Sequence, residues 1–128
     1  MPITPLYASL LALLFVGLSV RTLRLRGHYG VAVGPGKVPE LHRAMRAHAN
    51  FAEYVPLTLL LLYFLETQTP NRLLVHVFCS ALLLGRICHA YGISQVNENL
   101  NFRVTGMALT FIALIGTAFR LIALYVFS

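Results

Sequence analysis

Four polar side chains recur along one short stretch of the sequence, between residues 43 and 53. Arg43, Arg46, Asn50 and Glu53 follow one another at intervals of three or four positions. On a helix this spacing puts all four within an arc of about 80°, so that successive members are neighbours. Arginine binds carboxylates in a bidentate manner, and a carboxylate beside an amide can accept hydrogen bonds from an ammonium group. Such a face could hold a ligand that carries both charges.

The same face could instead be a structural ladder of ion pairs and hydrogen bonds that joins two helices. Glu53 lies about two turns inside an apolar stretch. A carboxylate there is costly unless it is paired or faces a polar cavity, so its presence fits either a structural ion pair or a ligand site. Two further groups favour a ligand site. Arg86 and His89 are three positions apart within another apolar stretch, and Arg103 begins a third. The alternatives are that Arg86 snorkels to the membrane surface and that His89 is a hydrogen-bonded interfacial histidine.

The composition indicates the kind of protein that must position these side chains. The chain has 128 residues, of which 58% are hydrophobic and only 11% are charged, with a formal net charge of +6. A soluble domain has roughly 25% charged residues. This shortage of charge excludes a disordered chain, a typical soluble enzyme and a nucleic-acid-binding domain. It predicts an integral membrane protein that forms one domain over residues 1–128.

Long segments almost free of charge give the expected membrane spans. A spanning helix needs about 20 mostly apolar residues, and helix is the only form that four such segments can adopt in lipid. The prediction is therefore an all-α, multi-pass four-helix bundle. Its spans should cover residues 4–23, 44–65, 71–92 and 102–126.

The basic residues predict the orientation in the membrane. Six of the ten lie between Arg21 and Arg46, and basic loops favour the cytoplasmic side. Both termini should then lie outside, with Arg46, Arg86 and Arg103 together near the cytoplasmic face. Arg120 falls near the opposite side, where we expect it to anchor the helix or to pair elsewhere. Small residues in the last span, Gly106, Thr110, Ala113 and Thr117, should allow close helix packing.

Cysteine and histidine give no sign of a disulfide or a metal site. Cys79 and Cys88 are nine positions apart in one predicted helix, so they point in opposite directions. We expect two free thiols. No metal-ligand spacing is present among the histidines, and no metal is predicted.

The motif Arg46-Ala-His48-Ala-Asn50-Phe-Ala-Glu53-Tyr-Val-Pro56 resembles the signature of the MAPEG family, the membrane-associated proteins in eicosanoid and glutathione metabolism. The end of the first span, Leu23-Arg24-Leu25-Arg26, and the segment Gly85-Arg86-Ile-Cys-His89 of the third are also similar. The resemblance extends over nearly the whole chain. It is strongest with short bacterial members of the YecN-like group, which would place a bacterial protein in the inner membrane.

The resemblance implies a homotrimer with a cytoplasm-facing site for glutathione, the co-substrate, between adjacent protomers. It implies a glutathione transferase or peroxidase that acts on a lipophilic electrophile or hydroperoxide dissolved in membrane lipid. By position, Arg103 matches the catalytic arginine that stabilises the thiol. The residues that match glutathione contacts are Arg24, Arg46, Asn50, Glu53, Arg86 and His89.

Three positions depart from the eicosanoid-producing relatives. Val104 replaces a hydroxyl residue that follows the catalytic arginine, and Met107 and Ile93 stand where those relatives have tyrosine. The departures argue against prostaglandin or leukotriene synthesis. They also leave open a non-catalytic scaffold that binds lipid or glutathione. A small transporter is a third alternative, although the clustering of charge toward one side argues against a translocation path.

Overall fold

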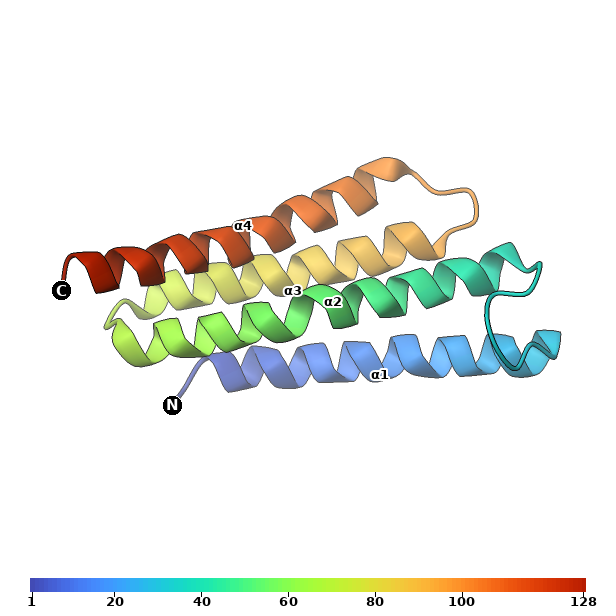
Figure 1. The fold of residues 1–128 in the computed structure, drawn as a ribbon, viewed down its shortest axis with the longest axis horizontal. Helices are drawn as coiled ribbons and strands as arrows, with labels where there is room; N and C mark the ends of the chain where they lie inside the picture. The colour runs from blue at the N-terminus through green and yellow to red at the C-terminus, as the bar shows by residue number, and fades with distance from the viewer.

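Four helices and no strands make up the computed structural model, which describes residues 1–128. The helices run alternately up and down as a bundle, and α1 and α4 lie on opposite sides of α2 and α3 (Figure 1). The all-helical prediction is confirmed. The helices are α1 (Thr4–Tyr29), α2 (Pro39–Gln68), α3 (Arg72–Ser94) and α4 (Leu100–Val126).

The helix ends follow from ordinary capping chemistry, and two helices extend well past the expected spans. Helix α1 continues to Tyr29 and stops at Gly30, whose φ of 65° is left-handed and suits glycine. Helix α2 begins at Pro39, a residue favoured in the first turn because it lacks an N–H. Asn71 caps α3 by accepting a hydrogen bond from the Leu74 N–H.

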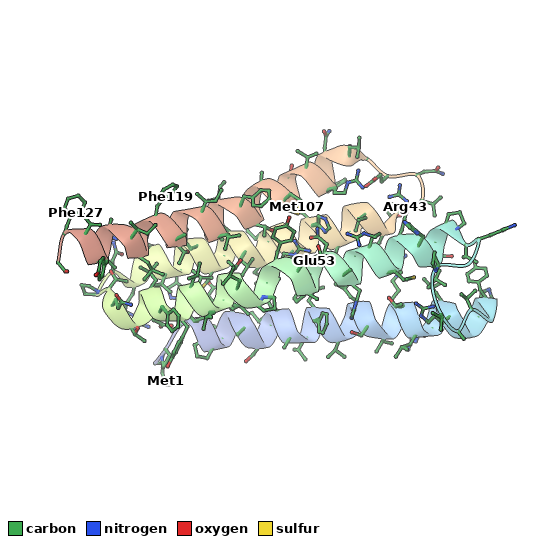
Figure 2. All side chains as sticks on the ribbon, in the orientation of Figure 1. Met1, Arg43, Glu53, Met107, Phe119 and Phe127 are labelled. Atoms are coloured by element: carbon green, nitrogen blue, oxygen red, sulfur yellow. The ribbon has the colours of Figure 1, made fainter.

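Three helices, α1, α3 and α4, are long and apolar enough to cross a membrane, and α2 is not among them. The expectation of four apolar spans is therefore met only in part. The reason lies in the polar stripe that begins with Arg43 and ends with Glu53, which lowers the hydropathy of α2. Only 25 of the 128 residues are buried, and large apolar side chains cover the outside, as Phe119 does on α4 and Phe127 does directly after it (Figure 2). This chain is an integral membrane protein.

The tightest junction of the bundle joins α3 to α4. A methyl group added at Gly106 would lie 2.5 Å from the backbone nitrogen of His89, and one added at Gly85 would lie 2.8 Å from the Gly106 carbonyl oxygen. Thr110, Ala113 and Thr117 continue the buried face of α4. The predicted stripe of small residues is confirmed as a packing surface. It fixes the backbone that carries His89 against the backbone that carries Arg103.

At the far end of the bundle, α2 holds the start of α1. The Glu66 carboxylate accepts hydrogen bonds from the backbone N–H groups of Ile3 and Thr4, the latter at 2.8 Å. Arg72 donates to the Met1 carbonyl oxygen at 2.9 Å. Partial burial raises the pKa of Glu66, but the two backbone donors and the Arg72 charge outweigh it, and the pKa lies below its ordinary value. The contacts of Glu66 and Arg72 thus join the start of α1 to α2 and α3.

The two cysteines are free, as expected. Cys79 is buried in the core between helices, and Cys88 is partly exposed on the other side of α3. Their opposite directions exclude a bond between them.

Candidate functional site

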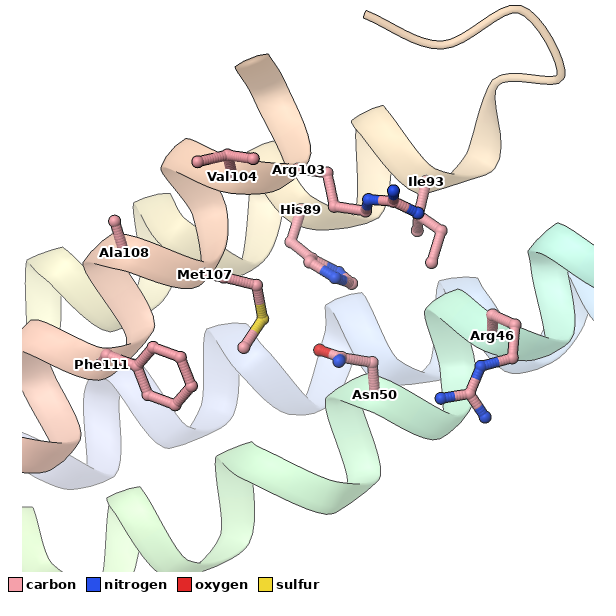
Figure 3. A pocket seen from close by; sticks show the side chains of 9 residues that line it. All are labelled: Arg46, Asn50, His89, Ile93, Arg103, Val104, Met107, Ala108 and Phe111. Carbon is pink, nitrogen blue, oxygen red and sulfur yellow. The ribbon is translucent and has the colours of Figure 1, made fainter. Parts of the chain in front are cut away.

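A pocket of about 610 Å³ opens between α2 and α4, with α3 at its back, near the end of the bundle where α3 turns into α4. Polar and apolar side chains both line the pocket, and Figure 3 shows Arg46 and Asn50 of α2 across from Met107 and Phe111 of α4. The polar members are Arg46, Asn50, His89 and Arg103. The apolar members are Ile93, Val104, Met107, Ala108 and Phe111.

The pocket contains four of the seven side chains that the sequence predicts for a ligand site. Arg46 and Asn50 come from α2, His89 comes from α3, and Arg103 comes from the first turn of α4. Three separate helices therefore supply the polar side chains of a single cavity. Such a cavity can bind a small anionic ligand that also presents hydrogen-bond donors.

Asn50 points from α2 into the space below Met107 (Figure 3). Its side-chain oxygen is buried and accepts no hydrogen bond. A buried acceptor without a donor is costly, and a ligand N–H group would remove that cost. Asn50 is thus suited to accept from an ammonium or amide group in the pocket.

Glu53 does not line the pocket. Its carboxylate lies 3.9 Å from the Arg46 guanidinium, and both side chains are about half exposed. An exposed ion pair at this distance contributes little to stability. The Arg46–Glu53 ion pair is therefore one contact of the structural alternative, but it is too weak to explain why all four polar residues share one face of α2.

Arg86 is completely buried behind the pocket. One guanidinium nitrogen, Nη2, lies 3.4 Å from His89 Nδ1, and the group sits 5.7 Å from the centre of the Phe51 ring. A side chain in this position does not snorkel to the membrane surface. Donation from Arg86 to Nδ1 leaves the His89 proton on Nε2. Arg86 can therefore orient His89 without touching a ligand in the pocket itself.

Sequence reasoning missed Glu98 as a member of this region. It lies in the connection between α3 and α4, and its Oε1 is 3.0 Å from Arg43 Nη1 and 3.2 Å from Arg103 Nη1. The Glu98 side chain is only 8% exposed. The sequence feature that could have singled it out is that the chain has only four acidic residues. Arg43, labelled in Figure 2, thereby joins α2 to the start of α4.

Two arginines also fix the end of α3 that forms the back of the pocket. Arg43 donates to the carbonyl oxygen of Ile93 at 3.2 Å, and Arg21 donates to that of Ser94 at 3.1 Å. Carbonyl groups at a helix C-terminus lack partners within the helix and favour positive charge. Helix α3 has no basic residue in its own last turn, so its neighbours supply this charge.

Comparison with known proteins identifies the family. The MAPEG family model matches residues 4–123. The chain belongs to the MAPEG family. It is 38% identical to inner membrane protein YecN of Escherichia coli strain K12 over 113 residues, which cover 88% of this chain and 85% of YecN. YecN of Escherichia coli O6:H1 gives the same values. No solved structure gives a significant match.

In this MAPEG chain, Arg24 lies apart from the pocket. It is exposed on α1, and α1 makes no contact with α4. Arg26, two positions further along α1, instead donates to the carbonyl oxygens of Val31 and Gly34 and so shapes the loop before α2. Within one protomer, the basic end of α1 is therefore not part of the pocket.

The three positions at which the sequence is expected to depart from eicosanoid-producing relatives all line the pocket. Ile93, Val104 and Met107 present only alkyl or thioether groups there. They leave no hydroxyl donor on the α4 side of the cavity. Arg103 and His89 are then the remaining donors on the α3–α4 side.

Arg120 lies in a separate hollow of about 420 Å³ at the far end, with Gln68 and Ser128 among its neighbours. It is exposed and has no ion pair. No group of three metal-binding side chains is present in the chain.

Proposed function

We propose that this MAPEG protein is a membrane-bound enzyme that binds glutathione in the pocket between α2 and α4. Arg103 would stabilise the glutathione thiolate, which attacks a lipophilic electrophile or reduces a hydroperoxide. One observation carries the proposal: a single cavity combines Arg46, Asn50, His89 and Arg103 with an apolar wall on α4. Glutathione has two carboxylates and one ammonium group, which match this combination of donors and acceptors.

The chemistry follows from the charge of the arginines. A free thiol has a pKa of about 8.5, and adjacent positive charge lowers it. Arg46 binds a ligand carboxylate, and Asn50 accepts from the ammonium or an amide. The thiolate held by Arg103 then forms a carbon–sulfur bond as a halide leaves the electrophile. With a hydroperoxide, two glutathione molecules give the disulfide, an alcohol and water.

The apolar wall suits a second substrate that arrives from the membrane. Val104 and Phe111 are exposed on the outside of α4 as well as lining the pocket. A compound that partitions into lipid would reach the thiolate past these residues. The pocket then needs no aqueous path for its second substrate.

Trimer formation and orientation belong to the same proposal. The exposed position of Arg24 on α1 allows it to contact the pocket of an adjacent protomer, which would add a fifth member of the seven predicted residues to the site. The clustering of basic residues around the pocket end favours a cytoplasmic site with both termini outside. Glutathione would then enter from the cytoplasm.

A second candidate is a non-catalytic protein that binds glutathione or lipid. The observation in its favour is that Val104 and Met107 supply no hydroxyl group to the pocket. Such a protein would bind glutathione in its thiol form and would not lower the thiol pKa. The two candidates therefore differ in one spectroscopic property.

The test is an ultraviolet difference spectrum of glutathione bound to the detergent-solubilised protein. A thiolate band is expected with native protein and with Arg120→Leu, the control at the far end. The band should be absent from Arg103→Leu, although much of the glutathione affinity remains because Arg46 and Asn50 are unchanged. Binding without a thiolate band in the native protein would favour the scaffold, and absence of glutathione binding would overturn the enzyme and leave only a lipid-binding scaffold.

A further inference from the structure

Glu98 places a carboxylate of the protein itself on an arginine of the pocket. Arg103 lines the cavity, whereas Glu98 does not. The Glu98 Oε1 atom forms ion pairs with both Arg43 and Arg103, at 3.0 and 3.2 Å. In the ligand-free protein, the guanidinium group of Arg103 is therefore already paired with an anion.

The two arginines that share Glu98 are not equivalent. Arg43 has a second acceptor, the Ile93 carbonyl oxygen at 3.2 Å, and its place against the end of α3 does not depend on Glu98 alone. Arg103 donates to no other group and is more exposed than Arg43, at 38% against 28%. Loss of the Glu98 charge should therefore release Arg103 and leave Arg43 in place.

The pairing is also incomplete on the side of Glu98. Its second oxygen, Oε2, has no hydrogen-bond partner, and the side chain is only 8% exposed. A buried carboxylate is favourable only when both oxygens are well satisfied. The contact between Glu98 and Arg103 is thus a weak one for a buried carboxylate, and a better-placed anion can compete with it.

We propose that Glu98 is a positioning residue that holds Arg103 in the empty pocket and yields it to the thiolate of the ligand. Arg103 exchanges the Glu98 carboxylate for the anionic sulfur of the ligand, while Arg43 keeps Glu98 in place. The inference rests on the proposed function, which assigns the glutathione thiolate to Arg103. It predicts that Glu98 weakens the binding only of ligands with a free thiol, because a ligand without an anionic sulfur does not displace Glu98.

The first measurement needs no ligand. Phenylglyoxal modifies accessible arginine side chains, and peptide mass spectrometry reports the rate at each arginine separately. Arg103 should react about threefold faster in Glu98→Gln than in native protein, as expected for loss of one partly exposed ion pair. Glu98→Asp, which keeps the charge but shortens the side chain, should give an intermediate rate. Arg120 is the internal reference and should react equally in all three proteins.

The second measurement uses glutathione and S-methylglutathione, in which the thiol is blocked and both carboxylates remain. Calorimetric titration of Glu98→Gln should give a Kd for glutathione about threefold lower than that of native protein. The Kd for S-methylglutathione should not change. Glu40→Gln is the matched control, because Glu40 lies at the same end of the bundle and pairs only with exposed Tyr29.

The outcomes separate this inference from the proposed function. An equal rate of Arg103 modification in native protein and Glu98→Gln would overturn the inference. Weaker glutathione binding by Glu98→Gln, or an equal gain in affinity for S-methylglutathione, would also overturn it. Faster modification of Arg103 together with no glutathione binding by native protein would support the pairing and contradict the proposed function instead.

Discussion

Glu66 and Glu98 are two carboxylates at opposite ends of the bundle, and they are used in different ways. Glu66 receives two backbone N–H groups, one on each oxygen, from the start of α1. Glu98 receives two arginines on a single oxygen, and its other oxygen has no partner. Backbone donors cannot move without unfolding the chain, whereas arginine side chains can turn to another anion. The Glu66 end is therefore suited to stability, and the Glu98 end is suited to exchange with a ligand.

At the Glu98 end, the largest expected effect is loss of activity on replacement of Arg103, the pocket arginine that pairs with Glu98. Arg103→Leu should lower the rate of glutathione conjugation to a chloronitrobenzene by about 100-fold, as for loss of one donor that stabilises developing negative charge. Its apparent unfolding temperature should stay close to that of native protein. The measurement is absorbance of the conjugate over time. Unchanged turnover would remove Arg103 from the chemistry.

The opposite pattern is expected when Glu66 is replaced. Glu66→Ala leaves the N–H groups of Ile3 and Thr4 without their acceptor, and an unsatisfied buried group costs about 1–3 kcal/mol. Thermal unfolding in detergent should therefore begin at a lower temperature. Glu40→Ala, which loses only an exposed contact with Tyr29, is the control and should unfold like native protein. A change in glutathione affinity for Glu66→Ala would contradict the separation between the two ends.

The smallest expected effect is on the stability of the protein at acidic pH. The pKa of Glu66 is lowered in the folded chain from an ordinary value of 4.5, so its stabilisation is present above that value and is lost as the pH falls through the lower folded pKa. The apparent unfolding temperature of native protein should fall over this acidic window. Glu66→Gln should show a smaller fall over the same window. Equal pH profiles for the two proteins would mean that this carboxylate does not link stability to pH.

The sequence was sufficient to predict the helices and which faces they use. The period of about 3.6 residues per turn puts Arg46 and Asn50 on one face of α2, and the same period predicts the buried face of α4 at Gly106 and Thr110. The helix ends were less predictable. Polar turns beyond the apolar spans, such as the one that ends at Tyr29, remain helical outside the region that hydropathy marks.

The relation between the faces could not be predicted from the period alone. Glu98 pairs with Arg43, which lies 55 positions earlier in the chain, and only the packing of α2 against α4 brings them together. Arg24 shows the converse, because its position beside other basic residues says nothing about which helix it faces. Burial of Arg86 under the Phe51 ring likewise depends on how α2 crosses α3.

The close approach of Gly85 and Gly106 makes the α3–α4 side of the pocket more rigid than the α2 side. No methyl group fits between α3 and α4 at this crossing, so these helices can neither slide nor rotate against one another without a clash. His89 and Arg103 are consequently carried by one rigid frame. The α2 wall, which bears Arg46 and Asn50, has no such restraint against α4. Ligands of different size should therefore be accommodated by displacement of α2, while the spacing between the His89 and Arg103 backbones stays constant.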